Sequence, residues 1–189
     1  MKRFVREEIR AFLKALDEHA PRKLRVVIIG GAAASLSYGS KGGTLDIDTA
    51  TNVSSLDAAA EAAKKETGLE IPFGRSSVFD APCEYESRLR RVPVPGLRRL
   101  TVLVPEKHDW ALMKVVRFED KDAEHIKAAA REVGLDKKTF EDRFLSEMTH
   151  VEPRARLILH FLAMIEELYG EQDAARMQEV IKGHKHWRY

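Results

Sequence analysis

The stretch VVIIGGAAASLSYGSKGGTLDIDTAT, residues 26–51, contains the residues that decide the fold. A β-branched apolar run opens it and predicts a short buried strand over residues 24–29. The pair Gly30-Gly31 and a run of small residues follow, which predicts a tight turn and then a helix. A glycine-rich loop then leads to Asp46-Ile47-Asp48, where polar and apolar residues alternate as in a strand.

The glycine pair lies where the first predicted strand ends and the helix begins. Glycine lets a ligand approach the backbone closely, and a helix start presents unpaired N–H groups and the positive end of the helix dipole. These properties suit a phosphate. A Gly-Gly turn at such a place also occurs for packing alone, so a second element is needed to indicate function.

Asp46 and Asp48 provide that second element. Residues i and i+2 of a strand share one face at roughly 6 to 7 Å, and two carboxylates at that separation can hold Mg²⁺. The alternative is an edge strand whose solvent-exposed face carries both residues. Their position after the glycine turn favours a combined metal and phosphate centre.

The flanking sequence predicts further elements on either side. An amphipathic helix begins near Phe4 and ends near Pro21, and a helix that opens at Ser54 is closed by Gly68. Residues 71–104 carry strand signals interrupted by prolines, and the best runs are residues 89–94 and 100–104. After these runs the pattern is helical, at residues 106–118, 121–133, 137–148, 153–169 and 172–182.

This order of elements predicts an α/β (α+β) protein with a mixed sheet, flanking helices and a C-terminal helical extension. We expect residues 1–105 to form the core with its N-terminal helix, and residues 106–189 to form a helical region that completes the site. One apolar stripe in this region, from Leu157 to Leu168, predicts a packing face, either within the chain or between two copies in a homodimer.

Composition limits the class of protein. The chain has 189 residues, and its formal net charge of +2 excludes the global positive field of a DNA-coating protein, so nucleic-acid binding would need a local patch. A single cysteine, Cys83, excludes an internal disulfide and a thiolate zinc site. Because no run approaches the roughly 18 apolar residues of a membrane span, we expect a soluble, cytoplasmic protein.

Residues 26–51 resemble the nucleotidyltransferase superfamily that includes DNA polymerase beta, whose signature is an apolar strand, a glycine pair, a short helix and Asp-x-Asp on the next strand. The closer resemblance is to small bacterial members such as the AbiEii-type abortive-infection toxins and related domains of unknown function. Thr44-Leu45-Asp46-Ile47-Asp48 matches their second motif. A later lysine and aspartate of those proteins match Lys114 and Asp122.

The resemblance implies a role for each matching residue. Asp46 and Asp48 would bind Mg²⁺ together with a third carboxylate, for which Glu86 is preferred over Asp80 and Glu84. Phosphates of a nucleoside triphosphate (NTP) would be held by Gly30, Gly31, Ser35, Thr44 and Lys114. Asp122 would orient Lys114 or act as a base on the acceptor, or complete the metal site itself. The alternative for Lys114 and Asp122 is an ordinary ion pair at a helix junction.

The function implied is transfer of a nucleoside monophosphate from an NTP to a hydroxyl of RNA (including tRNA), a protein or a small molecule. A toxin with an antitoxin partner fits the closer resemblance. The alternative is a non-catalytic nucleotidyltransferase fold that binds a protein or an RNA, and the uncertain third carboxylate favours it. More distant is an unrelated α/β protein that binds another phosphorylated ligand.

Five arginines gather around the turn at residues 93–96, and these are Arg88, Arg90, Arg91, Arg98 and Arg99. A basic hairpin beside the site would hold an RNA end or another polyanion. Charges that keep an edge strand from pairing with another chain explain the same pattern.

Overall fold

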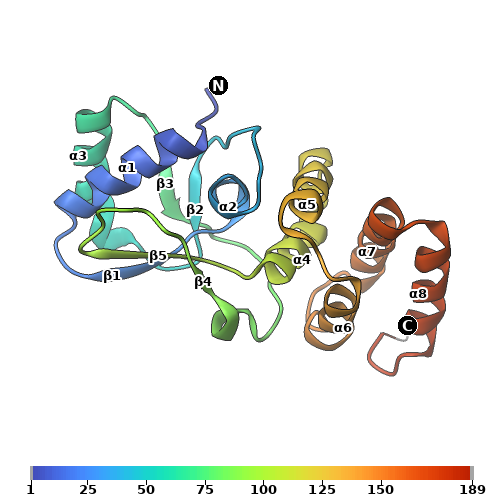
Figure 1. The fold of residues 1–189 in the computed structure, drawn as a ribbon. Coiled ribbons are helices and arrows are strands. Elements are labelled where there is room, and N and C mark those ends of the chain that lie inside the picture. Colours follow the sequence, from blue (N-terminus) through green and yellow to red (C-terminus); the bar gives the residue numbers. More distant parts are fainter. Residues whose placement is uncertain (1, 188–189) are drawn as a thin grey trace. The chain divides into compact units, whose positions relative to one another are not determined.

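The computed structural model describes residues 2–187, so residues 1, 188 and 189 lie outside the described part. It confirms an α+β architecture with a small mixed sheet, a second two-stranded sheet and flanking helices, consistent with a nucleotidyltransferase-like fold (Figure 1). The chain divides into two compact units. The first contains residues 1–79 and 88–105, and the second contains residues 80–87 and 106–189.

The first unit alternates strands and helices before it ends on strands. In chain order its elements are α1 (Arg6–His19), β1 (Leu24–Val27), α2 (Gly30–Ser37), β2 (Ile47–Thr49), the 3₁₀ turn η1 (Ser54–Leu56), α3 (Asp57–Thr67), β3 (Phe73–Arg75), β4 (Arg90–Arg91) and β5 (Leu100–Val104). The run at residues 89–94 is therefore shorter than predicted. Pro93 and Pro95 lack the N–H groups that a longer ladder needs.

The strands bring the end of β1 next to β2. β1 pairs with β5 in parallel, β4 pairs with β5 antiparallel, and β2 pairs with β3 in parallel. An isolated antiparallel bridge joins Ile28 to Thr49, and the Ile29 N–H donates to the Asp48 carbonyl at 2.9 Å. The point where the chain leaves β1 and enters α2 therefore lies beside the aspartate-bearing strand.

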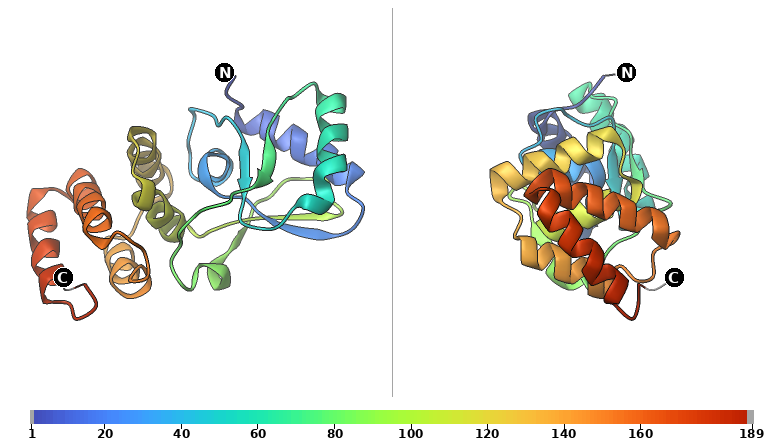
Figure 2. Two further views of the ribbon diagram at one scale, coloured as in Figure 1. Left: turned by 180° about the vertical axis from the view of Figure 1, so that it is seen from behind. Right: turned by 90° about the vertical axis from the view of Figure 1, so that its right-hand side faces the viewer.

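One face of the β1–β5 pair is buried, and the other is partly exposed, with Arg25 exposed and Leu103 buried. Val26, Leu100 and Val102 are buried and alternate with residues that are not fully buried, such as Arg25 and Thr101. Helices α1 and α3 contact each other and lie on the same side of β1 and β5 (Figures 1 and 2). The core is therefore a single layer between these helices and the buried sheet face.

Asp17 ties helix α1 to the start of β5. Its carboxylate accepts backbone hydrogen bonds from Arg98 at 2.9 Å, Arg99 at 2.8 Å and Leu100 at 2.6 Å. Burial alone would raise the pKa of Asp17, but the three backbone N–H donors outweigh it and lower the pKa below its ordinary value. The carboxylate therefore stays charged and fixes the turn before β5.

The second unit is helical. Its helices are α4 (Lys107–Arg117), α5 (Asp120–Val133), α6 (Lys137–Glu147), α7 (Arg154–Tyr169) and α8 (Glu171–Gly183). Each begins and ends within about one residue of the predicted range. Helix α4 contacts α5, α6 and α7, and α7 also packs against α8. Among the helices of residues 2–187, none has the length and apolar character needed to cross a membrane.

Candidate active site

The glycine turn contacts a carboxylate of β2. Gly30 begins α2 with a positive φ of 64°, a conformation that L side chains rarely adopt. A β carbon built on Gly30 would lie 3.6 Å from Oδ2 of Asp48. The start of α2 and the Asp48 carboxylate are therefore direct neighbours, as the sequence motif predicts.

Gly31 is needed for a different reason. A β carbon on Gly31 would lie only 2.6 Å from Oγ1 of Thr44, closer than real β carbons approach another heavy atom. The same hydroxyl donates to the Asp46 carbonyl at 3.0 Å and lies 3.4 Å from the Asp46 carboxylate oxygen Oδ1. Thr44 thus joins the glycine turn to Asp46, which is a contact that sequence reasoning did not identify.

The residues before α1 hold the loop that leads to the aspartates. Phe4 and Thr44 form an antiparallel bridge in which each N–H donates to the other's carbonyl, at 2.7 and 2.9 Å. Gly43, with a φ of 66°, passes so close that a β carbon would lie 2.9 Å from the Phe4 carbonyl oxygen. The loop is therefore fixed on one side by Phe4 and on the other by Gly31.

Asp46 and Asp48 flank a fully buried residue, Ile47. Strand β2 begins at Ile47, so Asp46 lies immediately before the strand. Both aspartates are partly exposed, whereas Ile47 and Thr49 are buried. This alternation places the two aspartates on the face opposite the core, beside the turn at Gly30.

Ser35, which was expected at the phosphates, lies in the core. Its side chain belongs to a residue that is 1% exposed, and its hydroxyl has no hydrogen-bond partner among the described residues. Its backbone carbonyl accepts a hydrogen bond from Nε of Arg6 at 2.6 Å. The hydroxyl is therefore packed inside helix α2's buried face.

No described strand supplies a third carboxylate. The sequences of β1, β3, β4 and β5 contain no aspartate or glutamate. Glu86 is exposed, lies in the 3₁₀ turn η2 (Tyr85–Arg88) and accepts a hydrogen bond from the Tyr85 hydroxyl at 3.3 Å. Its segment, residues 80–87, belongs to the second unit. Within residues 2–187, no three potential ligands form a metal-binding group.

Lys114 and Asp122 form a buried ion pair in the second unit. Nζ of Lys114 donates to Oδ1 of Asp122 at 2.7 Å. Arg117 donates to both carboxylate oxygens of Asp122 at 2.8 Å, and the Glu119 backbone N–H donates to Oδ2 at 3.2 Å. The side chain of Asp122 is 0% exposed, and that of Lys114 is 5% exposed.

The pKa values of this pair follow from its burial and contacts. Burial lowers the pKa of Lys114, and the charge of Asp122 offsets that only in part. Burial would raise the pKa of Asp122, but hydrogen bonds from Arg117 and Lys114 and their charges lower it to about 2. A carboxylate with so low a pKa and four donors suits an orienting group better than a general base.

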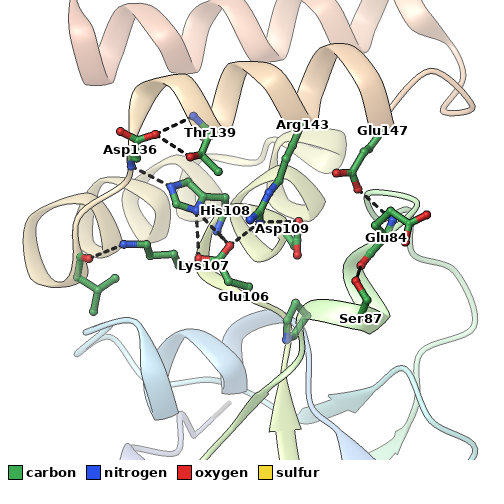
Figure 3. A network of polar contacts seen from close by, with 12 residues as sticks. Glu84, Ser87, Glu106, Lys107, His108, Asp109, Asp136, Thr139, Arg143 and Glu147 are labelled. Atoms are coloured by element: carbon green, nitrogen blue, oxygen red, sulfur yellow. Dashed lines mark hydrogen bonds and ion pairs between the residues drawn. The ribbon is translucent and has the colours of Figure 1, made fainter.

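A second polar network surrounds the start of α4 and was not predicted (Figure 3). Nη1 of Arg143, on α6, donates to Glu106 at 2.6 Å and to the fully buried Asp109 at 2.9 Å. The His108 ring accepts the Asp136 N–H at Nε2, so in the neutral ring the proton lies on Nδ1, 3.1 Å from the Glu106 carboxylate. These contacts fix the helix that carries Lys114.

The neighbouring part of Figure 3 shows why residues 80–87 belong to the second unit. The Glu84 N–H donates to the Glu147 carboxylate on α6 at 3.0 Å, and the Ser87 hydroxyl donates to the Glu84 carbonyl at 2.8 Å. Cys83 makes a further contact, because its thiol lies 3.3 Å from the Glu147 carbonyl. The segment with the predicted third carboxylate is thus anchored to α6.

A glycine turn at a helix start, adjoining two aspartates of the next strand within an α+β unit, is the arrangement of a nucleotidyltransferase-like fold. Residues 6–161 match the family described as nucleotidyltransferase of unknown function (DUF6036), so the chain belongs to that family. No curated protein and no solved structure gives a significant match.

Proposed function

We propose that this protein is a Mg²⁺-dependent nucleotidyltransferase that moves a nucleoside monophosphate from an NTP to an acceptor hydroxyl. The observation that carries the proposal is the contact between Asp48 and the turn at Gly30, with Asp46 tied to the same turn through Thr44. Family membership supports the class of reaction. The acceptor is a hydroxyl of RNA, a protein or a small molecule, and a toxin paired with an antitoxin is one setting for such an activity.

The donor set at this turn fits Mg²⁺. Two partly exposed carboxylates offer hard oxygen ligands, and Mg²⁺ commonly uses one or two carboxylates together with water and substrate phosphates. Asp46 and Asp48 would hold it. Bound there, Mg²⁺ would neutralise triphosphate charge and favour ionisation of the acceptor hydroxyl.

The turn itself supplies the phosphate contacts. Backbone N–H groups at the start of α2 lie beside Asp48, and the absence of a side chain at Gly30 leaves the backbone open to a phosphate, whereas the space beside Gly31 is filled by Thr44. Thr44 keeps the Asp46 backbone in place through its hydroxyl. Ser35 takes no part, because its hydroxyl is buried in α2.

Lys114 and Asp122 have a proposed role that rests on their motif. Lys114 would neutralise negative charge on the triphosphate, and Asp122 would hold its ammonium group in one orientation. The 2.7 Å contact and the low pKa of Asp122 support the orienting role. Replacing Lys114 by methionine would then lower nucleotide affinity.

A non-catalytic binding module is the second candidate. The absence of a third carboxylate on the described strands favours it, because the superfamily usually places one there. In that case Asp46 and Asp48 would serve only the fold or Mg²⁺-dependent NTP binding, and no nucleotide would be transferred.

The test uses the purified full-length chain with each α-labelled NTP, Mg²⁺ and total RNA or lysate. We expect label on a macromolecule with the wild type and none with Asp46→Asn/Asp48→Asn. Asp57→Asn is the matched control, because Asp57 is an exposed carboxylate in the first turn of α3. NTP binding without transfer, or neither binding nor transfer, would contradict the transferase and leave the non-catalytic module for a protein or an RNA.

A further inference from the structure

The near-zero net charge hides an uneven distribution between the two units. The first unit contains 17 Lys and Arg against 10 Asp and Glu, whereas the second contains 15 against 20. The first unit therefore carries the local excess of positive charge that nucleic-acid binding would need.

Much of this excess lies on the strands β1, β4 and β5 and the residues next to them. The exposed cations there are Arg22, Lys23, Arg25, Arg90, Arg91, Arg98 and Arg99, which we call the basic sheet surface. Arg99 donates to the Glu18 carbonyl. For the other six, the described residues include no carboxylate within ion-pair distance.

The register of the strands spreads these cations over the length of the sheet. Leu24 pairs with Leu100, so Lys23 and Arg99, the residues just before them, lie at the same end of the parallel strands. Arg90 and Arg91 pair with Val104 and Leu103 at the other end of β5. The arginines around residues 93–96 therefore lie in one β4–β5 hairpin but form two groups within it, Arg90 and Arg91 at one end and Arg98 and Arg99 at the other.

Arg25 and Arg91 connect the two groups across the partly exposed face. Arg25 pairs with Thr101, and both Arg91 and Val27 pair with Leu103. Paired residues share a face and alternate residues return to it, so Arg25 and Arg91 lie on the face opposite the buried Val26 and Val102. Helices α1 and α3 pack on that buried side (Figure 2).

We propose that the basic sheet surface of the first unit binds the phosphodiester backbone of a single-stranded nucleic acid. The six cations that have no carboxylate of the described chain within ion-pair distance are free to replace the counterions of a phosphate chain. The turn that carries Arg98 and Arg99 is fixed by Asp17, so the row is held in place before binding. This inference does not depend on nucleotidyl transfer.

Two observations favour a nucleic acid over an acidic protein. Protein interfaces need an apolar core, but the large exposed hydrophobic residues of the described chain lie elsewhere, at Val5, Val78, Val133, Leu159 and Val180. The apolar area next to Arg91 is instead a cavity of about 450 Å³ beside the turn at residues 93–97. This cavity is also lined by Leu100 and Val102 and therefore lies at the edge of the sheet, with Arg91 at its border and Arg25 on the opposite face. A hollow of this kind suits an unstacked base, which only a single strand offers.

The experiment measures binding of a labelled 20-nucleotide single strand, as RNA and as DNA, by fluorescence anisotropy at about 50 to 300 mM salt without NTP or Mg²⁺. We compare the wild type with Arg25→Gln/Arg91→Gln/Arg98→Gln. Since each phosphate contact contributes about 0.7 to the slope of log affinity against log salt, the variant should lose about 2 from that slope. We also expect at least about tenfold weaker binding at low salt, which is a loss of about 1.4 kcal/mol.

The matched control removes three positive charges from the covered side of the unit. Lys14→Gln/Lys64→Gln/Lys65→Gln changes helices α1 and α3 only, and it should keep the wild-type slope. Arg98→Gln alone, in the turn before β5, should lower the slope of log affinity against log salt by about 0.7. This single variant provides the test if the triple variant unfolds.

Three outcomes would overturn the proposal. They are no binding by the wild type at about 50 mM salt, an equal loss in the control variant, or competition by polyglutamate as strong as by the unlabelled strand. Preference for a duplex of the same length would contradict the single-stranded assignment. Asp46→Asn/Asp48→Asn should bind the strand normally, so this test and the transfer assay can fail separately.

Discussion

Gly30 and Gly31 are adjacent but have different physical constraints. Gly30 has a positive φ and faces Asp48, while Gly31 has no room for a β carbon because Thr44 is too close. The first constraint concerns backbone strain and access to the carboxylate, and the second concerns packing. Each therefore calls for its own substitution.

Gly30→Ala should destabilise the protein by about 1 to 2 kcal/mol, because alanine is strained in the left-handed region. Gly68→Ala is a close control, since Gly68 has a φ of 66° against 64° for Gly30 but no atom within 4 Å of its β-carbon position. Urea unfolding should show similar losses for both. Only Gly30→Ala should weaken Mg²⁺-dependent NTP binding, and an equal effect of Gly68→Ala on binding would show that strain alone is responsible.

Gly31→Ala should cost about 1 to 3 kcal/mol, because its methyl group would overlap Oγ1 of Thr44. Combining it with Thr44→Gly removes the overlapping atoms. A double-mutant cycle by urea unfolding should then give a favourable coupling of about 1 kcal/mol or more. Strict additivity would mean that the loop moves to accommodate the methyl group without Thr44.

The junction of α4 and α5 depends on one carboxylate. Asp122 receives hydrogen bonds from Lys114, Arg117 and the Glu119 backbone, and so it joins the end of one helix to the start of the next. Lys114 is equally buried but has fewer partners. The two ends of the pair should therefore differ in their sensitivity to substitution.

Asp122→Asn should destabilise the protein by about 3 to 5 kcal/mol, because it leaves the buried Lys114 without an opposite charge. Lys114→Met should cost less, since Asp122 keeps Arg117 and a backbone N–H. Glu179→Gln, in an exposed pair with Lys182, should change stability by less than about 1 kcal/mol. Chemical unfolding of the three variants gives the ranking, and a larger loss for Lys114→Met would contradict it.

The elements differ in how far the sequence determines them. Amphipathic spacing and the stop signals at Gly68, Gly134 and Gly170 are local, so the helices were predicted closely. The short strand β4 was overestimated, because a two-residue ladder depends on its partner β5 and not on its own apolar run.

The residues of the candidate site also differ in whether local sequence or long-range packing determines their contacts. The contact between Gly30 and Asp48 follows from a short motif, and local sequence was enough to predict it. Arg143 lies 37 residues from Glu106 and 34 from Asp109, so that network arises only from the packing of α6 on α4. The one local signal was a run of polar residues, Glu106 to Asp109, at the start of a helix that becomes buried.

Two carboxylates that make the stability of the protein sensitive to acid lie in the second unit. Burial would raise the pKa of Glu106, but hydrogen bonds from the side chain and backbone of His108 and from Arg143 lower the pKa from 4.5 to about 2. Asp122 is likewise lowered to about 2, and both lie in the second unit. As pH falls below about 4.5, these carboxylates become protonated in the unfolded chain but stay deprotonated in the folded protein. The free energy of unfolding therefore falls.

We therefore expect the contribution of Glu106 to the free energy of unfolding to be complete above pH 4.5 and to be lost as pH falls toward 2. Glu106→Gln removes that titration, so its stability should fall less steeply over this interval than that of the wild type. Glu179→Gln should follow the wild type, because Glu179 is exposed. Urea unfolding at several pH values makes the comparison, and parallel curves for wild type and Glu106→Gln would contradict the assignment.

The bond between Asp17 and the turn before β5 spans 81 to 83 residues of chain. The backbone groups of β1 that face β5 are likewise paired only after β5, its parallel partner, has been synthesised. On the ribosome, the N-terminal helix and first strand therefore emerge long before the residues that complete their layer. Until β5 has been synthesised, the Ile28 N–H that donates to Leu103 has no partner, and β1 presents an unpaired strand edge of the kind that chaperones protect.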